Sequence, residues 1–457
     1  MTEVVVTVNS PGEVATWLEP LARELLPRLA DGRLTVMIPP CTYASGAEAR
    51  VVRSFLGGDP RVAVLEPQEV LGWLLLGRRP RGYEPVGRGA VLFLGGDMVY
   101  AAWIARRLGY RALAYTEGRV RWTGTFERFL LPDERALERA LRRLGAQAEG
   151  LRPRLEVVGD LMVDAARSRI PLPQVRAWLG LEPGEQLLLL LPGSRAAEIH
   201  LVLPLYLEAL ACLAGPSGPD PARGKPGRPL RAVVALSPFV DGEEALAVAR
   251  WALRQAGGWR EMGVEGSSAD LPGVRRVVLA ERVEGGRPLR VELVQGASRE
   301  LMAVADLALT LPGSSTAEMA AFGLPMVVVL PLQWPEKIPL EGLPGLVGRL
   351  PGVGPAVKRW AVRRLDRSIG FVALPNRWAG RAVVPELRGV VRPEVLAREL
   401  AGWLDDEARR AHLRQALEGL RGEPGAAQRV AARVLTLAQA GLGTGESGGP
   451  DVQEVVS

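Results

Sequence analysis

Short apolar runs rich in β-branched residues alternate with amphipathic stretches along the first third of the chain. Runs of this length and composition are typical of strands that are buried on both faces of a parallel sheet. The stretches between them, such as 16–29 and 99–109, place apolar residues at helical spacing. The alternation predicts a doubly wound α/β domain. Its strands are expected within 3–9, 33–40, 90–97, 111–117, 128–134 and 155–160.

The alternation starts again at residue 186 and predicts a second α/β domain. Its strands are expected within 186–194, 231–238, 274–280, 306–315, 325–331 and 370–376. Prolines and charges between the two halves indicate a linker, and apolar residues at three-to-four spacing predict helices over 392–406 and 407–422. We therefore expect two Rossmann-like domains that face a central cleft, with C-terminal helices closing the structure. The expected units are an N-terminal domain, a linker, a C-terminal domain, closing helices and a disordered tail, at 1–165, 166–185, 186–390, 391–440 and 441–457.

Composition excludes several classes of function. The chain has 457 residues, which agrees with two domains, and its net charge of +6 comes almost entirely from arginines spread over the whole sequence. No nucleic-acid-binding motif is present, so no nucleic-acid partner is expected. Cys41 and Cys212 are far apart, and His200 and His412 are the only histidines, so neither a metal nor another cofactor is expected. The chain lacks a leader-like start and a long apolar run, which predicts a cytoplasmic protein, soluble or peripheral on the membrane.

The first candidate site is the stretch LPGSRAAEI at 191–199. A buried strand runs into Gly193 and Ser194 and then into a helix with Arg195 and Glu198 near its first turn. The strand end and the helix-start N–H groups of such a turn bind anions, and an arginine adds a bidentate charge for a phosphate. The alternative is a plain strand-to-helix turn with a surface ion pair.

The second candidate site, GSSTAE, repeats this layout after the strand within 306–315. Gly313, Ser314 and Ser315 form the turn, and Thr316 and Glu318 lie at the start of the next helix. The serines and their N–H groups suit phosphate oxygens, and a glutamate can accept two ribose hydroxyls, which together favour a nucleotide-sugar ligand. A capping box, in which Glu318 only closes a serine cap, is the alternative.

These two motifs and LPNRWAGRAVVPEL at 374–387 resemble, in the same order, motifs of the lipid A disaccharide synthase family. The resemblance implies a GT-B fold and a peripheral membrane enzyme that needs no metal. It implies transfer of 2,3-diacylglucosamine from UDP to 2,3-diacylglucosamine 1-phosphate with inversion. Arg195 would match the family's essential arginine near the donor phosphates, and Glu318 the glutamate of its UDP-binding turn. Asn376 and Arg381 would match polar residues of its LPN and AGR segments.

The resemblance is looser in the N-terminal half. Asp97, after the strand within 90–97, would match a functional aspartate of the family and is our candidate general base. An N-cap of the next helix is the alternative. The turn SPGEVATW keeps Gly12 and Glu13 of the family's acceptor-side motif but not the rest, and the family's Gly-His-Pro is replaced by 159–161.

These departures leave the acceptor open. A GT-B transferase acting on another lipid, a UDP-N-acetylglucosamine 2-epimerase and a non-catalytic UDP-sugar-binding protein are the alternatives. Segments 70–88 and 339–367 place apolar residues beside arginines and could rest on an anionic membrane, although core packing would give the same pattern.

Overall fold

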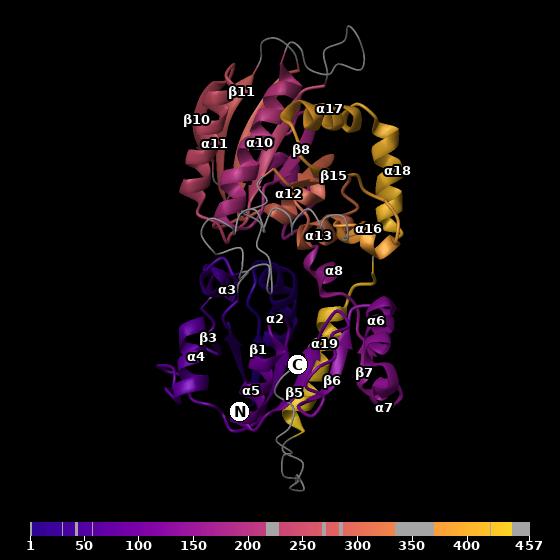
Figure 1. Ribbon diagram of the computed structural model, residues 1–457. Helices are drawn as coiled ribbons and strands as arrows, with labels where there is room; N and C mark the ends of the chain where they lie inside the picture. The colour runs from indigo at the N-terminus through magenta and orange to yellow at the C-terminus, as the bar shows by residue number, and fades with distance from the viewer. Residues whose placement is uncertain are drawn as a thin grey trace, which may run out of the picture.

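The protein folds into two α/β domains, one above the other in Figure 1. The computed structural model describes residues 2–29, 31–41, 44–56, 58–215, 228–266, 271–282, 287–333, 370–420 and 422–440. The tail at 441–457 and the candidate membrane segment 339–367 lie outside these residues.

The N-terminal sheet has seven parallel strands in the order β3-β2-β1-β4-β5-β6-β7. The strands are β1 (Glu3–Thr7), β2 (Arg33–Met37), β3 (Val62–Leu65), β4 (Gly89–Phe93), β5 (Arg111–Tyr115), β6 (Phe126–Leu131) and β7 (Leu155–Val157). The strand order reverses between β1 and β4. In such sheets ligands bind beyond the carboxyl ends of the strands that flank this reversal.

The C-terminal sheet has eight strands in the order β10-β11-β12-β9-β8-β13-β14-β15. The strands are β8 (Gln186–Leu191), β9 (Leu230–Leu236), β10 (Arg260–Gly266), β11 (Arg275–Arg282), β12 (Leu289–Gln295), β13 (Leu307–Thr310), β14 (Met326–Pro331) and β15 (Glu386–Gly389). Strand β11 pairs antiparallel with β10 and with β12, and the other pairs between the described strands of this sheet are parallel. The order reverses between β8 and β13, so the two motif-bearing turns, which follow these strands, lie side by side.

Helices cover both sheets. Those of the N-terminal half are α1 (Pro11–Glu13), a π-helical turn η1 (Val14–Leu18), α2 (Glu19–Leu25), η2 (Leu26–Arg28), α3 (Glu48–Leu56), α4 (Pro67–Leu76), α5 (Met98–Leu108), α6 (Glu134–Leu144), η3 (Gly145–Gln147), α7 (Ala148–Leu151), η4 (Arg152–Arg154) and α8 (Leu161–Ala165). Those that follow are α9 (Leu172–Leu179), α10 (Ala196–Ala214), α11 (Gly242–Ala256), α12 (Ser298–Val304), α13 (Ser314–Phe322), α16 (Leu374–Ala379), α17 (Pro393–Leu404), α18 (Glu407–Glu418) and α19 (Ala426–Gln439).

The chain crosses between the domains twice. After α8 it enters the C-terminal domain, where Val175 and Leu179 of α9 are buried in that domain's core. Much of the expected linker therefore packs with the C-terminal domain. After α18 the chain returns, and α19 lies against the N-terminal sheet (Figure 1), where Val430 and Val434 are buried with β1 and β4. The last helix thus completes the first domain.

The expected α/β pattern and the two-domain arrangement are confirmed, with one wrong strand. Residues 370–373 form no strand, because the N–H groups of Val372 and Ala373 donate to the carboxylate of Glu386 instead of a neighbouring strand. Helix α16 then begins at Leu374, with Pro375 in its first turn.

Helix α10 is long and apolar enough to cross a membrane, and it is the one such helix among the described residues. It packs against α11 and α17, and half of its apolar stretch is buried. Core packing therefore accounts for its composition.

Candidate functional site

The carboxyl ends of both sheets meet at the domain junction. A Cβ atom placed on Gly12, in the turn after β1, would lie 3.0 Å from the Ser314 Oγ in the turn after β13. Arg50 of α3 donates to the carbonyl of Pro238 at 3.2 Å, and Phe239 is buried in the N-terminal core. The candidate donor and acceptor turns are therefore in contact across the junction.

A cavity of about 660 Å³ lies between the domains, beside the contact of Arg50 with Pro238. Ligand pockets of this size hold molecules as large as a nucleotide sugar. Its walls come from both domains, and the polar side chains among them carry both signs of charge. The lining residues are Ala44, Ser45, Gly46, Ala47, Arg50, Arg195, Ala196, Phe239, Val240, Asp241, Gly242, Glu244 and Gln295.

The turn after β8 is built around Glu198. Its Oε2 accepts the N–H groups of Ser194 at 2.7 Å and Arg195 at 3.1 Å, and its Oε1 pairs with the Arg195 guanidinium at 2.8 Å. Gly193 has a φ of 120°, and a Cβ there would lie 2.3 Å from the Glu198 carboxylate, so only glycine fits. The ion pair of Arg195 with Glu198, which was the alternative interpretation of this turn, is therefore formed. Arg195 also lines the cavity. Glu198 orients this arginine and occupies two of the N–H groups expected to bind phosphate.

The turn after β13 differs, because no side chain caps α13. The capping-box alternative for Glu318 is therefore wrong. The Glu318 carboxylate instead accepts from the Arg299 Nε at 2.9 Å. Ser315 Oγ lies 3.3 Å from the Thr310 hydroxyl, and Thr316 donates to the Gly313 carbonyl at 2.7 Å. Ser314 of this turn therefore lies against Gly12 of the N-terminal domain, while Ser315 bonds back to β13.

The third motif, at 374–387, contacts the second motif, GSSTAE, through a hydrogen bond. The Thr316 hydroxyl accepts the N–H of Leu374 at 3.2 Å. Asn376 is fully buried: its amide donates to the Val384 carbonyl at 2.9 Å and to Glu386 at 2.8 Å, and its oxygen accepts the Val384 N–H at 2.8 Å. Arg381 is exposed. Asn376 therefore holds the 374–386 loop together, and the donor role predicted for Asn376 and Arg381 stays a prediction.

On the opposite side, Asp97 and Glu13 have different surroundings. Asp97 is exposed and accepts the Val99 N–H at 3.0 Å, so the N-cap alternative is confirmed. Glu13 is partly buried, and its carboxylate accepts the N–H groups of Asn9 at 3.0 Å and Gly96 at 3.2 Å. Burial raises the pKa of the Glu13 carboxyl, although these N–H groups oppose the rise. Glu13 thus joins the turn after β1 to the one that carries Asp97.

Two residues of the junction carry no sequence signal of their own. Arg299 follows β12 and bonds to Glu318 and to the N-terminal domain, and Gln295 closes the cavity wall by donating to the Val240 carbonyl at 3.1 Å. Both lie near the end of a strand that local patterns did not predict. Among the described residues, no group of three His, Cys, Asp or Glu side chains is placed to hold a metal ion.

Known proteins resemble this chain in sequence and in fold. No protein-family model matches it. The lipid-A-disaccharide synthase of Anaeromyxobacter sp. (strain K) is 30% identical over 269 residues, which are 58% of this chain and 53% of that protein. The chain thus spans about half the length of that relative. The lipid-A-disaccharide synthase of Alkalilimnicola ehrlichii is 30% identical over 334 residues, 71% of this chain and 67% of that protein.

Solved structures agree on the fold. A Listeria monocytogenes structure provisionally assigned as a UDP-N-acetylglucosamine 2-epimerase superposes with a TM-score of 0.54 and 15% identity, covering 96% of this chain and 97% of that one. Staphylococcus aureus MnaA with UDP superposes with a TM-score of 0.51 and 13% identity, covering 96% and 98%. These superpositions establish the two-domain GT-B fold. At such low sequence identity they establish no function. With the sequence relatives, they show that the chain belongs to the lipid-A-disaccharide synthase family.

Proposed function

We propose that this protein is a glycosyltransferase that moves 2,3-diacylglucosamine from its UDP donor to 2,3-diacylglucosamine 1-phosphate, with inversion at the sugar carbon. One observation carries the proposal. Gly12 of the acceptor-side turn packs against Ser314 of the second donor motif, and Arg195 of the first donor motif lines a cavity between the two domains. A transferase needs such a meeting of donor and acceptor sites.

In the proposed reaction, the acceptor hydroxyl attacks the anomeric carbon and UDP departs. Arg195 and the first N–H groups of α13 offset the charge that develops on the leaving diphosphate. Glu318 accepts the ribose hydroxyls. Asp97 takes the proton of the acceptor hydroxyl, and Glu13 keeps the Asp97 turn in place through the Gly96 N–H.

The test is disaccharide formation from the two acylated substrates, followed by mass spectrometry. Replacement of Asp97 by Asn keeps the cap on α5, since both residues cap helices equally well, but removes the base. We expect kcat to fall roughly a hundredfold or more, with stability unchanged within about 0.5 kcal/mol. Arg195→Ala should lower turnover by a similar factor.

The matched control is Asp133→Asn, because Asp133 also caps a helix, α6, through the Ala136 N–H at 2.6 Å but follows β6, away from the reversal between β1 and β4. Full activity of both Asp97→Asn and Arg195→Ala would overturn the proposal.

A different acceptor is the second candidate, and the altered turn after β1 favours it. The Glu13 carboxylate there is bonded to the backbone N–H groups of Asn9, Ser10 and Gly96. This candidate would be supported if calorimetry shows that the protein binds UDP and if the protein transfers the sugar to another lipid acceptor. UDP binding without turnover or donor hydrolysis would select a UDP-sugar-binding protein.

We also propose that the protein acts in the cytoplasm, resting on the inner face of the membrane through the end of α4. Leu75 and Leu76 there are 63% and 65% exposed, and Arg78, Arg79 and Arg81 beside them are exposed as well. Apolar side chains next to arginines suit an anionic bilayer. Sedimentation with phosphatidylglycerol vesicles should carry down the full chain but much less of a Leu75→Ser, Leu76→Ser variant.

A further inference from the structure

Arg299 joins the donor turn to the opposite domain. It is the second residue of α12, and its side chain is only 15% exposed. Its Nε donates to Glu318 Oε1 at 2.9 Å, its Nη1 to Glu19 Oε2 at 2.9 Å and its Nη2 to the Ala15 carbonyl at 2.6 Å. One guanidinium therefore bonds to Glu318, the residue proposed to bind the ribose, and to two acceptors of the N-terminal domain.

The electrostatics make this arrangement stable. Burial opposes the charge on Arg299, but the carboxylates of Glu318 and Glu19 outweigh it and raise the pKa of the guanidinium. Removing one partner of such a buried set leaves another charge poorly compensated. Arg299 therefore stays charged and keeps both carboxylates near it.

The shape of the guanidinium links the partners. Its five donors lie in one rigid plane, with the Nε edge toward Glu318 and the outer nitrogens toward Glu19 and Ala15. A shift of the N-terminal contacts must therefore rotate the plane and move its bond to Glu318. The bond uses one carboxylate oxygen of Glu318, and a carboxylate has about four acceptor positions, so it can accept hydroxyls while Arg299 holds it.

We propose that Arg299 is a positioning residue that orients Glu318 toward the donor ribose hydroxyls and couples this orientation to docking of the N-terminal domain. The proposal rests on the proposed function, because it assumes a UDP-linked donor. The contact between Gly12 and Ser314 independently places the same N-terminal turn against the donor turn.

The test compares the binding of UDP and of 2′,3′-dideoxy-UDP by calorimetry. Arg299→Gln should weaken UDP binding about tenfold but dideoxy-UDP binding less than about twofold, because only UDP offers the hydroxyls that Glu318 accepts. Glu19→Gln should show the same selectivity with a smaller loss, about threefold. If Arg299→Gln does not fold, Arg299→Lys keeps the charge without the planar fork and should show the same selectivity.

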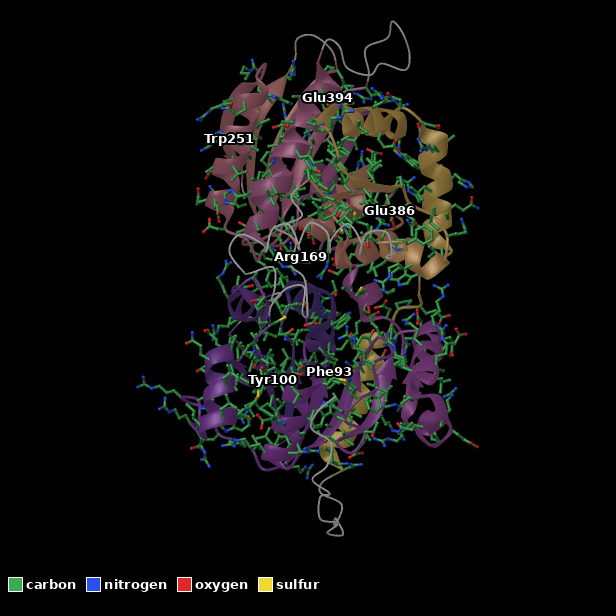
Figure 2. All side chains as sticks on the ribbon, viewed as in Figure 1. Phe93, Tyr100, Arg169, Trp251, Glu386 and Glu394 are labelled. Carbon is green, nitrogen blue, oxygen red and sulfur yellow. The ribbon has the colours of Figure 1, made fainter. Side chains whose placement is uncertain are left out.

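The matched control is Arg169→Gln. Arg169 lies near the domain junction (Figure 2) and pairs with Glu300, the next residue of α12, at 2.9 Å. It should change neither affinity by more than about twofold, because the Arg169 side chain bonds to Glu300 and to the Gly296 carbonyl rather than to Glu318. If Arg299→Gln loses affinity for UDP and for dideoxy-UDP equally, Arg299 has only a structural role. If Glu19→Gln leaves both affinities unchanged, the coupling to domain docking is refuted. Failure of the unaltered protein to bind UDP would instead overturn the proposed function.

Discussion

Gly95 lies in the turn after β4, two residues before the proposed base Asp97. A Cβ on Gly95 would lie 2.0 Å from the Glu13 carboxyl carbon, so the side chain of an alanine cannot fit without displacing Glu13. Displacement breaks the bonds of Glu13 to Asn9 and Gly96. We expect Gly95→Ala to lower the free energy of unfolding by about 2 to 4 kcal/mol in urea titrations.

Gly72 provides the control, since it lies within α4 and a Cβ there meets nothing within 4 Å. Gly72→Ala should be neutral or stabilise by up to about 1 kcal/mol. A Gly95→Ala variant as stable as Gly72→Ala would contradict the close packing of Glu13.

Asp160 predicts a pH dependence of stability. Burial raises the pKa of this carboxyl to about 6 from its ordinary value of 3.8. The folded state therefore binds the proton more tightly than the unfolded state, so stability falls as the pH rises from about 4 to 6. Asp160→Asn imitates the protonated form and keeps the cap on α8. Because Asp160 is only partly buried, we expect a gain of about 1 to 2 kcal/mol at pH 7.5.

At pH 4 the same variant should match the unaltered protein within about 0.5 kcal/mol, measured by urea denaturation. An equal gain at both pH values would exclude titration of Asp160 as its cause.

At the scale of single elements, Asp164 fixes the start of α19. Its two carboxylate oxygens accept the N–H groups of Gly425 and Ala427, each at 2.6 Å. Asp164→Ala leaves both N–H groups without this acceptor. We expect a loss of about 1 to 2 kcal/mol and faster hydrogen exchange within 426–439.

Asp406→Ala is the control, because Asp406 caps α18 through the Arg409 N–H at 2.8 Å. It should speed exchange in α18 and leave α19 protected. Faster exchange in α19 after both changes would show that the effect is not local.

Strand β12 was not predicted from the sequence, because an arginine and a glutamate interrupt its apolar residues. In β12, Glu292 is fully buried and pairs with Arg276 at 2.7 Å and Arg231 at 3.4 Å. A periodicity analysis treats such residues as exposed. The sequence predicts the candidate turns at Arg195 and Glu318 because the residues of each turn are consecutive in the chain. Arg299 was missed because its partner Glu19 is 280 residues away.

At the scale of the whole molecule, the N-terminal domain depends on the last helix. Helix α19 buries Val430, Val434 and Leu435 in the N-terminal core. A fragment of residues 1–165 should therefore be insoluble or fail to unfold cooperatively, since its core stays uncovered. Co-expression with a peptide of residues 422–440 should restore a cooperative transition. A stable monomer of residues 1–165 alone would contradict this dependence.

The two crossings between the domains also set how the cleft can open. They pass side by side: a Cβ on Gly422 would lie 3.4 Å from Val163, and Asp164 binds Gly425. Two connecting segments that contact each other in this way should act as a hinge. The domains could then rotate apart about the hinge, but sliding or twisting of one domain against the other would be resisted. Figure 1 shows α8, which carries Val163 and Asp164, on one side of the junction and α3 on the other. During opening, the contact of Arg50 with Pro238 should therefore travel furthest, while that of α8 with α13 should hardly move.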